Sequence, residues 1–457
     1  MQTEHRNIDS SLKTILAISI PLILTALSSN LMFLIDRMVL AYYSINAMNA
    51  AAICGNLVSI FAFAFIAIAG ISEIYIGQSN GQKDFDKLAV PVWQMIYFSL
   101  AGFAIMFPIG YFTEYINLLP EYCKKEGIEY QRVLAYFCSI PAMNVAFAAF
   151  FIGQGKTKII TYAVIIGSVS NVFLDILLIF GYKNIIPEMG CSGAAIATVL
   201  SELIQILILA IVFFNSNNRL RYGTFKNRKF NKKIFLGCLK LGHPLVIGRI
   251  FELLAWYLVY VAISHVSKNQ ATLQGVCVSI YVLFAFICEG INKSSAAISS
   301  NLIGQRNLEA IRKSYKTFLK FILILCGFIT IPLILFPQSI FYFFDMLHED
   351  ISGLYPSMKI IFKLLVINIT LEAIWSALWG ILMSGGDTRY PMIANICSLW
   401  FFLVIPVGIM YYTGQLNSAI PIYWLTLLWC ISTLILLYKR YKSLKWYNLL
   451  KTHDNST

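Results

Sequence analysis

Acidic side chains inside long apolar stretches are the residues of this sequence best suited to do chemistry. In the first half of the chain these are Asp36 and Asp175, and Asn171 lies four residues before Asp175. Residues four apart share one face of a helix, so Asn171 and Asp175 can present oxygen atoms side by side. Two carboxylates in one desolvated pocket repel each other, which favours a shared proton or a bound monovalent cation. Asp36, Asn171 and Asp175 are therefore a candidate site for proton or cation coupling.

An alternative role for Asp36 is a simple ion pair with Arg37 near the edge of its apolar segment. Neighbouring residues on a helix point about 100° apart, which makes this pairing poor. The geometry therefore leaves Asp36 available to face inward.

The second half of the chain carries its acidic residues at other positions. Glu252 lies eight residues after Pro244, and Glu372 lies eight residues before Gly380. Each carboxylate is a candidate cation ligand. Arg249 precedes Glu252 by one turn on the same helix face, so a structural salt bridge is the alternative role for Glu252. The sequence leaves both roles open.

Further ionisable residues also lie in apolar segments. Glu289 and Lys293 are four apart, which favours an ion pair inside the membrane, with a place in a polar cavity as the alternative. Glu73 and Glu202 are weaker candidates, because each could be satisfied by a hydrogen bond between helices.

The segments that position these residues are typical of membrane-spanning helices. Of the 457 residues, 58% are hydrophobic and 12% are charged, whereas soluble proteins carry about a quarter charged residues. A spanning helix needs roughly 20 apolar residues. The sequence therefore predicts an all-α membrane protein with twelve transmembrane helices, near residues 14–41, 47–76, 88–112, 130–152, 159–181, 191–214, 236–264, 271–303, 317–337, 357–383, 391–413 and 419–438.

The distribution of positive charge predicts the orientation of these helices. The net charge is +13, and the two termini and the loops after every second helix hold 24 Lys or Arg residues against seven on the opposite side. Because positive residues stay on the cytoplasmic side, both termini are expected to be cytoplasmic, with the protein in the cytoplasmic (inner) membrane. Seven of these residues lie between 219 and 233, in a predicted cytoplasmic loop at mid-chain.

The two halves of the chain resemble each other. Pro21 has a counterpart at Pro244, and residues 78–84 and 153–158 have counterparts at 301–307 and 384–389, in the same order. Such a repeat predicts two six-helix lobes related by a pseudo-two-fold axis along the membrane normal. The predicted organisation is an N-terminal lobe at 1–215, a basic linker at 216–235, a C-terminal lobe at 236–440 and a tail at 441–457.

Two stretches of the sequence resemble motifs of the multidrug and toxic compound extrusion (MATE) family. Residues 171–175 and 190–198 are similar to its "N-x-x-L-D … G-x-x-G-A-A-x-A-T" signature, and residues 380–388 are similar to its "G-x-L-R-G-x-G-D-T" segment, with Met383 and Ser384 in place of Arg and Gly. The resemblance covers essentially all twelve predicted helices.

The family resemblance implies roles for the acidic residues. Asp36, Asn171 and Asp175 occupy the positions of the family's N-lobe cation or proton site. Glu252 and Glu372 match the spacing of a C-lobe cation site in the NorM-like branch, where Asp is common at the position of Glu372.

The expected function is secondary active antiport of amphipathic organic cations against Na+ or H+. A flippase for a lipid-linked saccharide is the alternative, because Arg249 and Lys293 could bind a pyrophosphate. No constellation of a membrane-embedded enzyme is found in the sequence, so the protein is not expected to be an enzyme. Neither a cofactor nor nucleic acid is expected, no metal is expected apart from Na+ at the coupling sites, and a monomer in the lipid bilayer is predicted.

Overall fold

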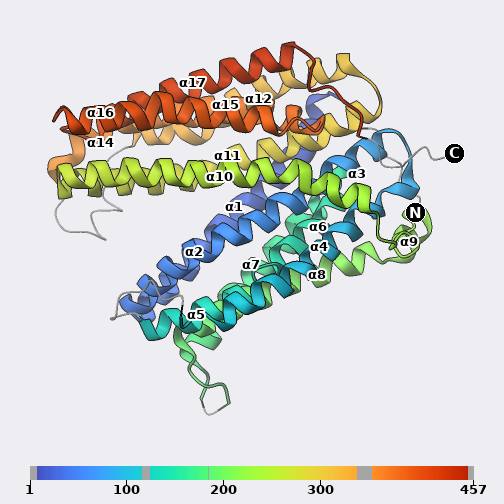
Figure 1. Ribbon diagram of the computed structural model, residues 1–457, viewed down its shortest axis with the longest axis horizontal. Helices are drawn as coiled ribbons and strands as arrows, with labels where there is room; N and C mark the ends of the chain where they lie inside the picture. Colours follow the sequence, from blue (N-terminus) through green and yellow to red (C-terminus); the bar gives the residue numbers. More distant parts are fainter. Residues whose placement is uncertain (1–7, 116–123, 184, 337–351, 451–457) are drawn as a thin grey trace. The chain divides into compact units, whose positions relative to one another are not determined.

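The computed structural model describes residues 8–115, 124–183, 185–336 and 352–450, and most of these residues are helical (Figure 1). Within these ranges, eleven helices are long and apolar enough to cross a membrane, and a bent pair of helices makes a twelfth if the pair counts as one span. The predicted all-α membrane fold is therefore confirmed.

The first half of the chain forms helices α1 to α9. Their bounds are Leu12–Tyr43 (α1), Ile45–Gly70 (α2), Ser72–Gly81 (α3), Ala89–Tyr111 (α4), Lys124–Tyr136 (α5), Ile140–Gly153 (α6), Thr157–Phe180 (α7), Gly190–Phe213 (α8) and Ser216–Tyr222 (α9), with a short 3-10 turn at Phe85–Lys87.

The second half forms α10 to α17. Their bounds are Lys232–Val266 (α10), Lys268–Gly304 (α11), Leu308–Leu335 (α12), Tyr355–Ser384 (α14), Arg389–Leu399 (α15), Ile405–Tyr412 (α16) and Ile420–Lys442 (α17). A 3-10 turn at Ser352–Leu354 precedes α14, and a π-helical turn at Trp400–Val404 joins α15 to α16.

Within the described residues, every predicted span overlaps one of these helices or a pair of consecutive helices. The end of the ninth predicted span, residue 337, lies outside them. The fourth predicted span is bent by 40° between α5 and α6. Pro141 lies in the first turn of α6, where its missing N–H costs least and where it cannot continue the preceding helix. The hydroxyl of Ser99 donates to the backbone carbonyl of Ser139 at 2.5 Å, so a carbonyl at the break has a partner, as the apolar membrane interior requires.

The described helices divide into two compact units. The first unit contains residues 20–246, 304–306 and 449–450, and the second contains residues 8–19, 247–303 and 307–448. The boundaries inside α1 and α10 fall beside Pro21 and Pro244, which are the two prolines paired by the sequence repeat. The predicted lobe boundaries and the axis that would relate the lobes stay predictions.

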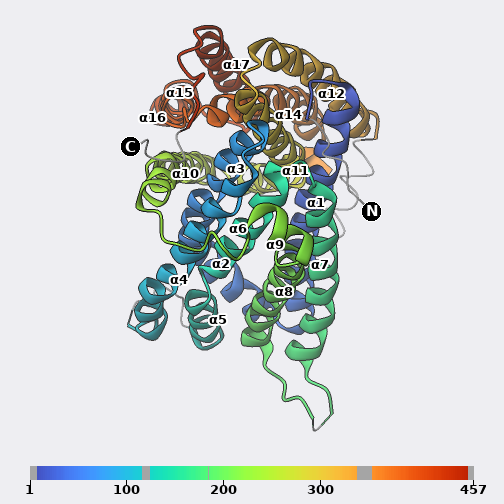
Figure 2. The ribbon, with the colours of Figure 1, turned by 90° about the vertical axis from the view of Figure 1, so that its right-hand side faces the viewer.

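In the first unit, α7 and α8 run side by side in both views of the ribbon (Figure 1, Figure 2). A Cβ atom added at Gly193 would lie 2.6 Å from the backbone oxygen of Leu178, and Ala194 and Ala195 are buried beside Ile179. Small residues let membrane helices approach this closely. The glycine- and alanine-rich part of the predicted signature therefore serves helix packing.

In the second unit, the segment after α14 that belongs to the motif at residues 380–388 also has a structural role. Asp387 accepts a hydrogen bond from Nε of Arg440 at 2.7 Å, in an ion pair that is largely buried. Gly385 packs against the backbone and ring of Trp446, which is itself buried. This segment therefore holds the end of α17 and the chain that follows it.

Candidate functional site

The carboxyl groups of Asp36 on α1 and Asp175 on α7 meet inside the first unit. Asp36, Asn171 and Asp175 are all buried, with exposed fractions of 7%, 1% and 0%, and the two carboxyls lie within hydrogen-bonding reach of each other. No donor among the described residues reaches either oxygen of Asp175 or Oδ1 of Asp36. Because ionised carboxylates only accept hydrogen bonds, this pair needs a shared proton or a cation between its oxygens.

Polar contacts between α1 and α7 set the register that brings the two carboxyls together. The hydroxyls of Thr25 and Thr161 are 3.0 Å apart, and the hydroxyl of Ser28 donates to that of Ser168 at 3.0 Å. Positions 161, 168 and 175 are seven residues apart and so lie on nearly the same face of α7. The face that carries these two hydroxyls therefore also carries Asp175 toward α1.

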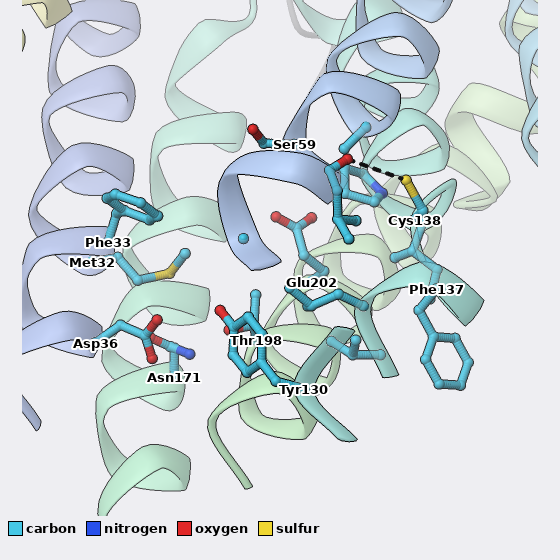
Figure 3. A pocket seen from close by; sticks show the side chains of 17 residues that line it. Met32, Phe33, Asp36, Ser59, Tyr130, Phe137, Cys138, Asn171, Thr198 and Glu202 are labelled. Atoms are coloured by element: carbon cyan, nitrogen blue, oxygen red, sulfur yellow. Dashed lines mark hydrogen bonds between the residues drawn. The ribbon is translucent and has the colours of Figure 1, made fainter. Parts of the chain in front are cut away.

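Asp36 opens onto a pocket of about 190 Å³ within the first unit (Figure 3). The pocket is lined by side chains of α1, α2, α7, α8 and the α5–α6 segment, among them Met32, Phe33, Asp36, Ser59, Tyr130, Phe137, Cys138, Asn171, Thr198 and Glu202. The wall is mostly apolar and aromatic, with a few polar groups, as is usual for sites that bind small organic molecules.

Arg37 makes no ion pair with Asp36 among the described residues, although its positive charge acts on that carboxyl. Its guanidinium lies over the ring of Phe33, 4.3 Å from the centroid, and no ion pair joins it to Asp36 in the part of the chain that the structure describes. The angular separation of adjacent helical residues explains this arrangement. The simple surface pairing considered for Asp36 is therefore wrong.

Glu202 on α8 also lines the pocket, one turn after Thr198. Asn144 on α6 donates to its carboxylate at 2.7 Å and to the side-chain oxygen of Gln205 at 3.0 Å. The interhelical hydrogen bond expected for Glu202 is thus present. The sequence did not predict a place in the site for Tyr130, Thr198 or Ser59, because nothing in their local sequence shows that their helix faces meet.

The three acidic residues of the second unit that the sequence places in apolar segments, Glu252, Glu289 and Glu372, each have a partner. Glu252 accepts a hydrogen bond from Nη1 of Arg249 at 2.9 Å, and Glu289 accepts one from Lys293 at 2.9 Å. Glu372 accepts a hydrogen bond of 2.5 Å from the hydroxyl of Tyr281. The favoured ion pair of Glu289 with Lys293 and the alternative salt bridge of Glu252 with Arg249 are both present. A cation role for Glu252 and Glu372 stays a prediction.

The charges of Glu252, Glu289, Glu372, Arg249 and Lys293 interact with one another. Arg249 also acts on Glu289 and Glu372, and Glu252 acts on Glu372. Three carboxylates and two cations leave this cluster with a net charge of −1 when all are ionised. A cation would be attracted to it, but it would compete with Arg249 and Lys293 for the carboxylate oxygens.

Long apolar helices and a buried, partnerless acidic pair beside a pocket define a helical membrane transporter. The MatE family model matches residues 21–177 and again residues 244–410, so the chain belongs to the MATE family and is an integral membrane protein. The double match falls on the two halves that the repeat predicted, because Pro21 and Pro244 begin the two matched ranges.

Similar proteins agree with this membership. The chain is 25% identical over 351 residues to the probable multidrug resistance protein YoeA of Bacillus subtilis, which covers 73% of each chain. It is 24% identical over 397 residues to the probable multidrug resistance protein NorM of Thermotoga maritima, covering 83% of this chain and 82% of that one.

Solved structures share the fold. A crystal structure of a MATE protein in complex with MaL6 has a TM-score of 0.84 at 20% identity and covers 97% of this chain and 100% of that one. A MOP superfamily transporter from Pyrococcus furiosus, with a binding pocket of reverse polarity that suggests a different function, has a TM-score of 0.84 at 18% identity and covers 99% and 100%.

Proposed function

We propose that this protein is a secondary active antiporter that exports amphipathic organic cations in exchange for Na+ or H+. The Asp36–Asp175 pair is the observation that carries this proposal. Three of its four carboxyl oxygens are buried without a donor among the described residues, so the pair calls for one positive charge. Membership of a transporter family, and relatives named probable multidrug resistance proteins, support export of drug-like molecules.

Competition for the same carboxylates would couple the two fluxes. A proton or Na+ between Asp36 and Asp175 satisfies their charge, and so would the ammonium group of an organic cation in the adjoining pocket. The rings of Phe33, Tyr130 and Phe137 in the pocket wall offer apolar and cation–π contacts to such a molecule. A ligand shifts a conformational equilibrium only by its differential affinity, so exclusion of one cation by the other is a sufficient basis for exchange.

The proposed cycle begins with the coupling ion, which binds at Asp36 and Asp175 from outside and displaces the organic cation. Glu252 and Glu372 supply a second site in the C-terminal lobe. The return of the loaded protein to its inward-facing state then releases the ion to the cytoplasm. In this proposal the protein works as a monomer in the cytoplasmic membrane with both termini cytoplasmic, and it needs no cofactor and no nucleic acid.

A lipid-linked saccharide flippase receives less support. A pyrophosphate would need free cationic side chains, and Arg249 and Lys293 both donate to carboxylates. The charged cluster that contains them is net negative when ionised.

Proteoliposomes with separately imposed Na+ and H+ gradients test the proposal. Each vesicle is loaded with a fluorescent organic cation, and its release is followed with an inward gradient of one ion at a time. Release driven by one or both gradients supports antiport. Equal release with and without any gradient, or transport of a pyrophosphate-linked lipid instead, would overturn it.

A further inference from the structure

The linker between α8 and α10 is strongly positively charged, and this charge has no part in the proposed transport cycle. Between residues 203 and 251 the sequence contains neither Asp nor Glu. Seven of its cationic side chains are exposed, namely Arg219, Arg221, Lys226, Arg228, Lys229, Lys232 and Lys233. We call these seven, together with the exposed apolar residues between them, the linker surface.

Hydrogen bonds from α4 hold this linker within the first unit. Nε1 of Trp93 donates to the backbone oxygen of Thr224 at 2.7 Å. Gln94 donates to the backbone oxygen of Lys229 at 3.1 Å and accepts from the backbone N–H of Asn231 at 2.9 Å. Together with the hydrogen bond from Tyr97 to the oxygen of Arg228, these contacts fix the backbone of the linker to α4 and determine where its charges point.

Apolar side chains are exposed beside the cations. Leu220, Phe225 and Phe230 are 86%, 46% and 58% exposed. The guanidinium groups of Arg219 and Arg228 lie 5.4 Å and 4.8 Å from the centroid of the Phe225 ring. Leucine and phenylalanine side chains alternating with Lys and Arg are characteristic of segments that lie at a membrane interface.

The neighbouring loop has no net charge with which to balance the linker surface, because Lys83 and Lys87 offset Asp84 and Asp86. Asp84 is paired with Lys87, and the backbone oxygen of Asp86 accepts a hydrogen bond from Asn227. Burial lowers the pKa of the nearby Lys156, and the positive charge of Arg221 lowers it further. Lys156 and Arg221 therefore repel each other, and an external anion would relieve this repulsion.

We propose that the linker surface binds the phosphate headgroups of anionic membrane lipids. The spans α8 and α10 end at Phe213 and begin at Lys232, so the residues between them must lie at the level of the headgroups. Clusters of Lys and Arg next to a spanning helix attract anionic lipids, and the exposed Leu220, Phe225 and Phe230 fit the apolar layer just below. Because α4 holds the linker, lipid binding would stabilise the first unit.

The test compares short-chain phosphatidylglycerol with phosphatidylcholine of the same chain length, titrated into the purified full-length protein. The readout is the thermal unfolding midpoint. The variant is Lys226→Gln with Lys229→Gln and Lys232→Gln, which leaves the arginine–aromatic contacts in place. The matched control removes three exposed lysines of α12 in the same way, Lys313→Gln with Lys316→Gln and Lys320→Gln.

Phosphatidylglycerol is expected to raise the midpoint of the wild type and of the control, and phosphatidylcholine is not. The linker variant should need at least about tenfold more phosphatidylglycerol for half of the effect. An equal requirement in the linker variant and the wild type would overturn the proposal. The same increase with sodium phosphate alone would also overturn it, because it would indicate a site for free anions.

A second measurement on the wild type does not depend on the variant being folded. High NaCl screens exposed charges, so it should abolish most of the increase caused by phosphatidylglycerol. An increase that persists unchanged at high salt would contradict binding through the linker surface.

Discussion

Asp36 and Asp175 differ from Glu252 and Glu372, because no donor among the described residues reaches Oδ1 of Asp36 or either oxygen of Asp175. Glu252 has Arg249 and Glu372 has the hydroxyl of Tyr281, whereas both oxygens of Asp175 lack a partner among the described residues. Buried acceptors without donors cost free energy. The cost is best explained if a proton or another cation binds between these carboxyls and leaves them during transport.

Asparagine substitutions test this explanation at the residue scale. Asp36→Asn or Asp175→Asn removes one charge and supplies an amide donor to the remaining carboxylate. Each variant is therefore expected to unfold at the same temperature as the wild type or higher, and to lose ion-driven efflux by at least about tenfold. Thermal unfolding in detergent and gradient-driven efflux in proteoliposomes give the two readouts. Full efflux from both single variants would leave the pair without a role in coupling.

A double-mutant cycle separates the two roles of Glu252. Glu252→Gln deprives Arg249 of this carboxylate, and because Arg249 is 43% exposed the loss of stability should be modest, about 1 kcal/mol. Adding Arg249→Leu removes both charges and should restore stability. We predict that transport is still lost in the double variant. Removing the unpaired charge of Arg249 does not replace the carboxylate that binds the coupling ion.

Thermal stability and gradient-driven efflux are measured on the two single variants and on the double variant. Wild-type efflux from the double variant would make Glu252 a purely structural residue, and coupling would then belong to Asp36 and Asp175.

Part of this site was predictable from the sequence. The spacing of Asn171 and Asp175 places them on one face of a helix, and this required no tertiary information. The approach of Asp36 to Asp175 depends on the register between α1 and α7, which hydroxyl contacts such as Thr25–Thr161 determine. The pocket was not predictable either, because Tyr130 is buried in its wall by packing between helices distant in sequence.

At the scale of elements, α4 positions the linker as well as crossing the membrane. Gln94 is fully buried and makes two hydrogen bonds to the linker backbone, at Lys229 and Asn231. The sequence predicted only a basic loop here, since no pattern in residues 219–233 reveals the partners on α4. The linker is consequently more ordered than its polar composition suggests.

Gln94→Met tests how much of this order depends on one side chain. Loss of two hydrogen bonds should cost about 2 kcal/mol of local stability and raise the population of the open linker by about tenfold or more. Limited digestion with trypsin, which cleaves after Lys and Arg, should then cut the linker correspondingly faster. Gln154→Met is the control, because the amide of Gln154 donates within its own helix. Equal cleavage rates in Gln94→Met and the control would contradict the proposed role of Gln94.

The spans themselves were predictable because each needs only a run of apolar residues. The bend between α5 and α6 was not part of the prediction, although Pro141 marks it. A proline permits a bend without fixing its angle. The donor to the Ser139 carbonyl is the hydroxyl of Ser99, which lies on α4. This contact between helices cannot be predicted from the local sequence.

At the scale of the whole molecule, the repeat preserves architecture but not chemistry. The family model matches both halves, and the boundaries between the two units lie beside the equivalent prolines Pro21 and Pro244. The acids are not repeated, because the positions equivalent to Asp36 and Asp175 hold Val259 and Pro406. The unpartnered carboxyl pair therefore belongs to the first half alone, and the two halves are expected to contribute unequally to coupling.

The orientation of the whole chain is tested with two cysteines placed in exposed positions of the first unit. Lys226→Cys lies in the linker, which its positive charge assigns to the cytoplasm, and Ile185→Cys lies in the loop between α7 and α8, on the predicted opposite side. Both are made with Cys397→Ser and Cys123→Ser, because Cys397 is the exposed cysteine of the described residues and Cys123 lies outside them. An impermeant thiol reagent added to intact cells should label Ile185→Cys and should label Lys226→Cys only after the membrane is opened. The reverse pattern would invert the topology, and with it the direction in which the proposed antiporter moves its cations.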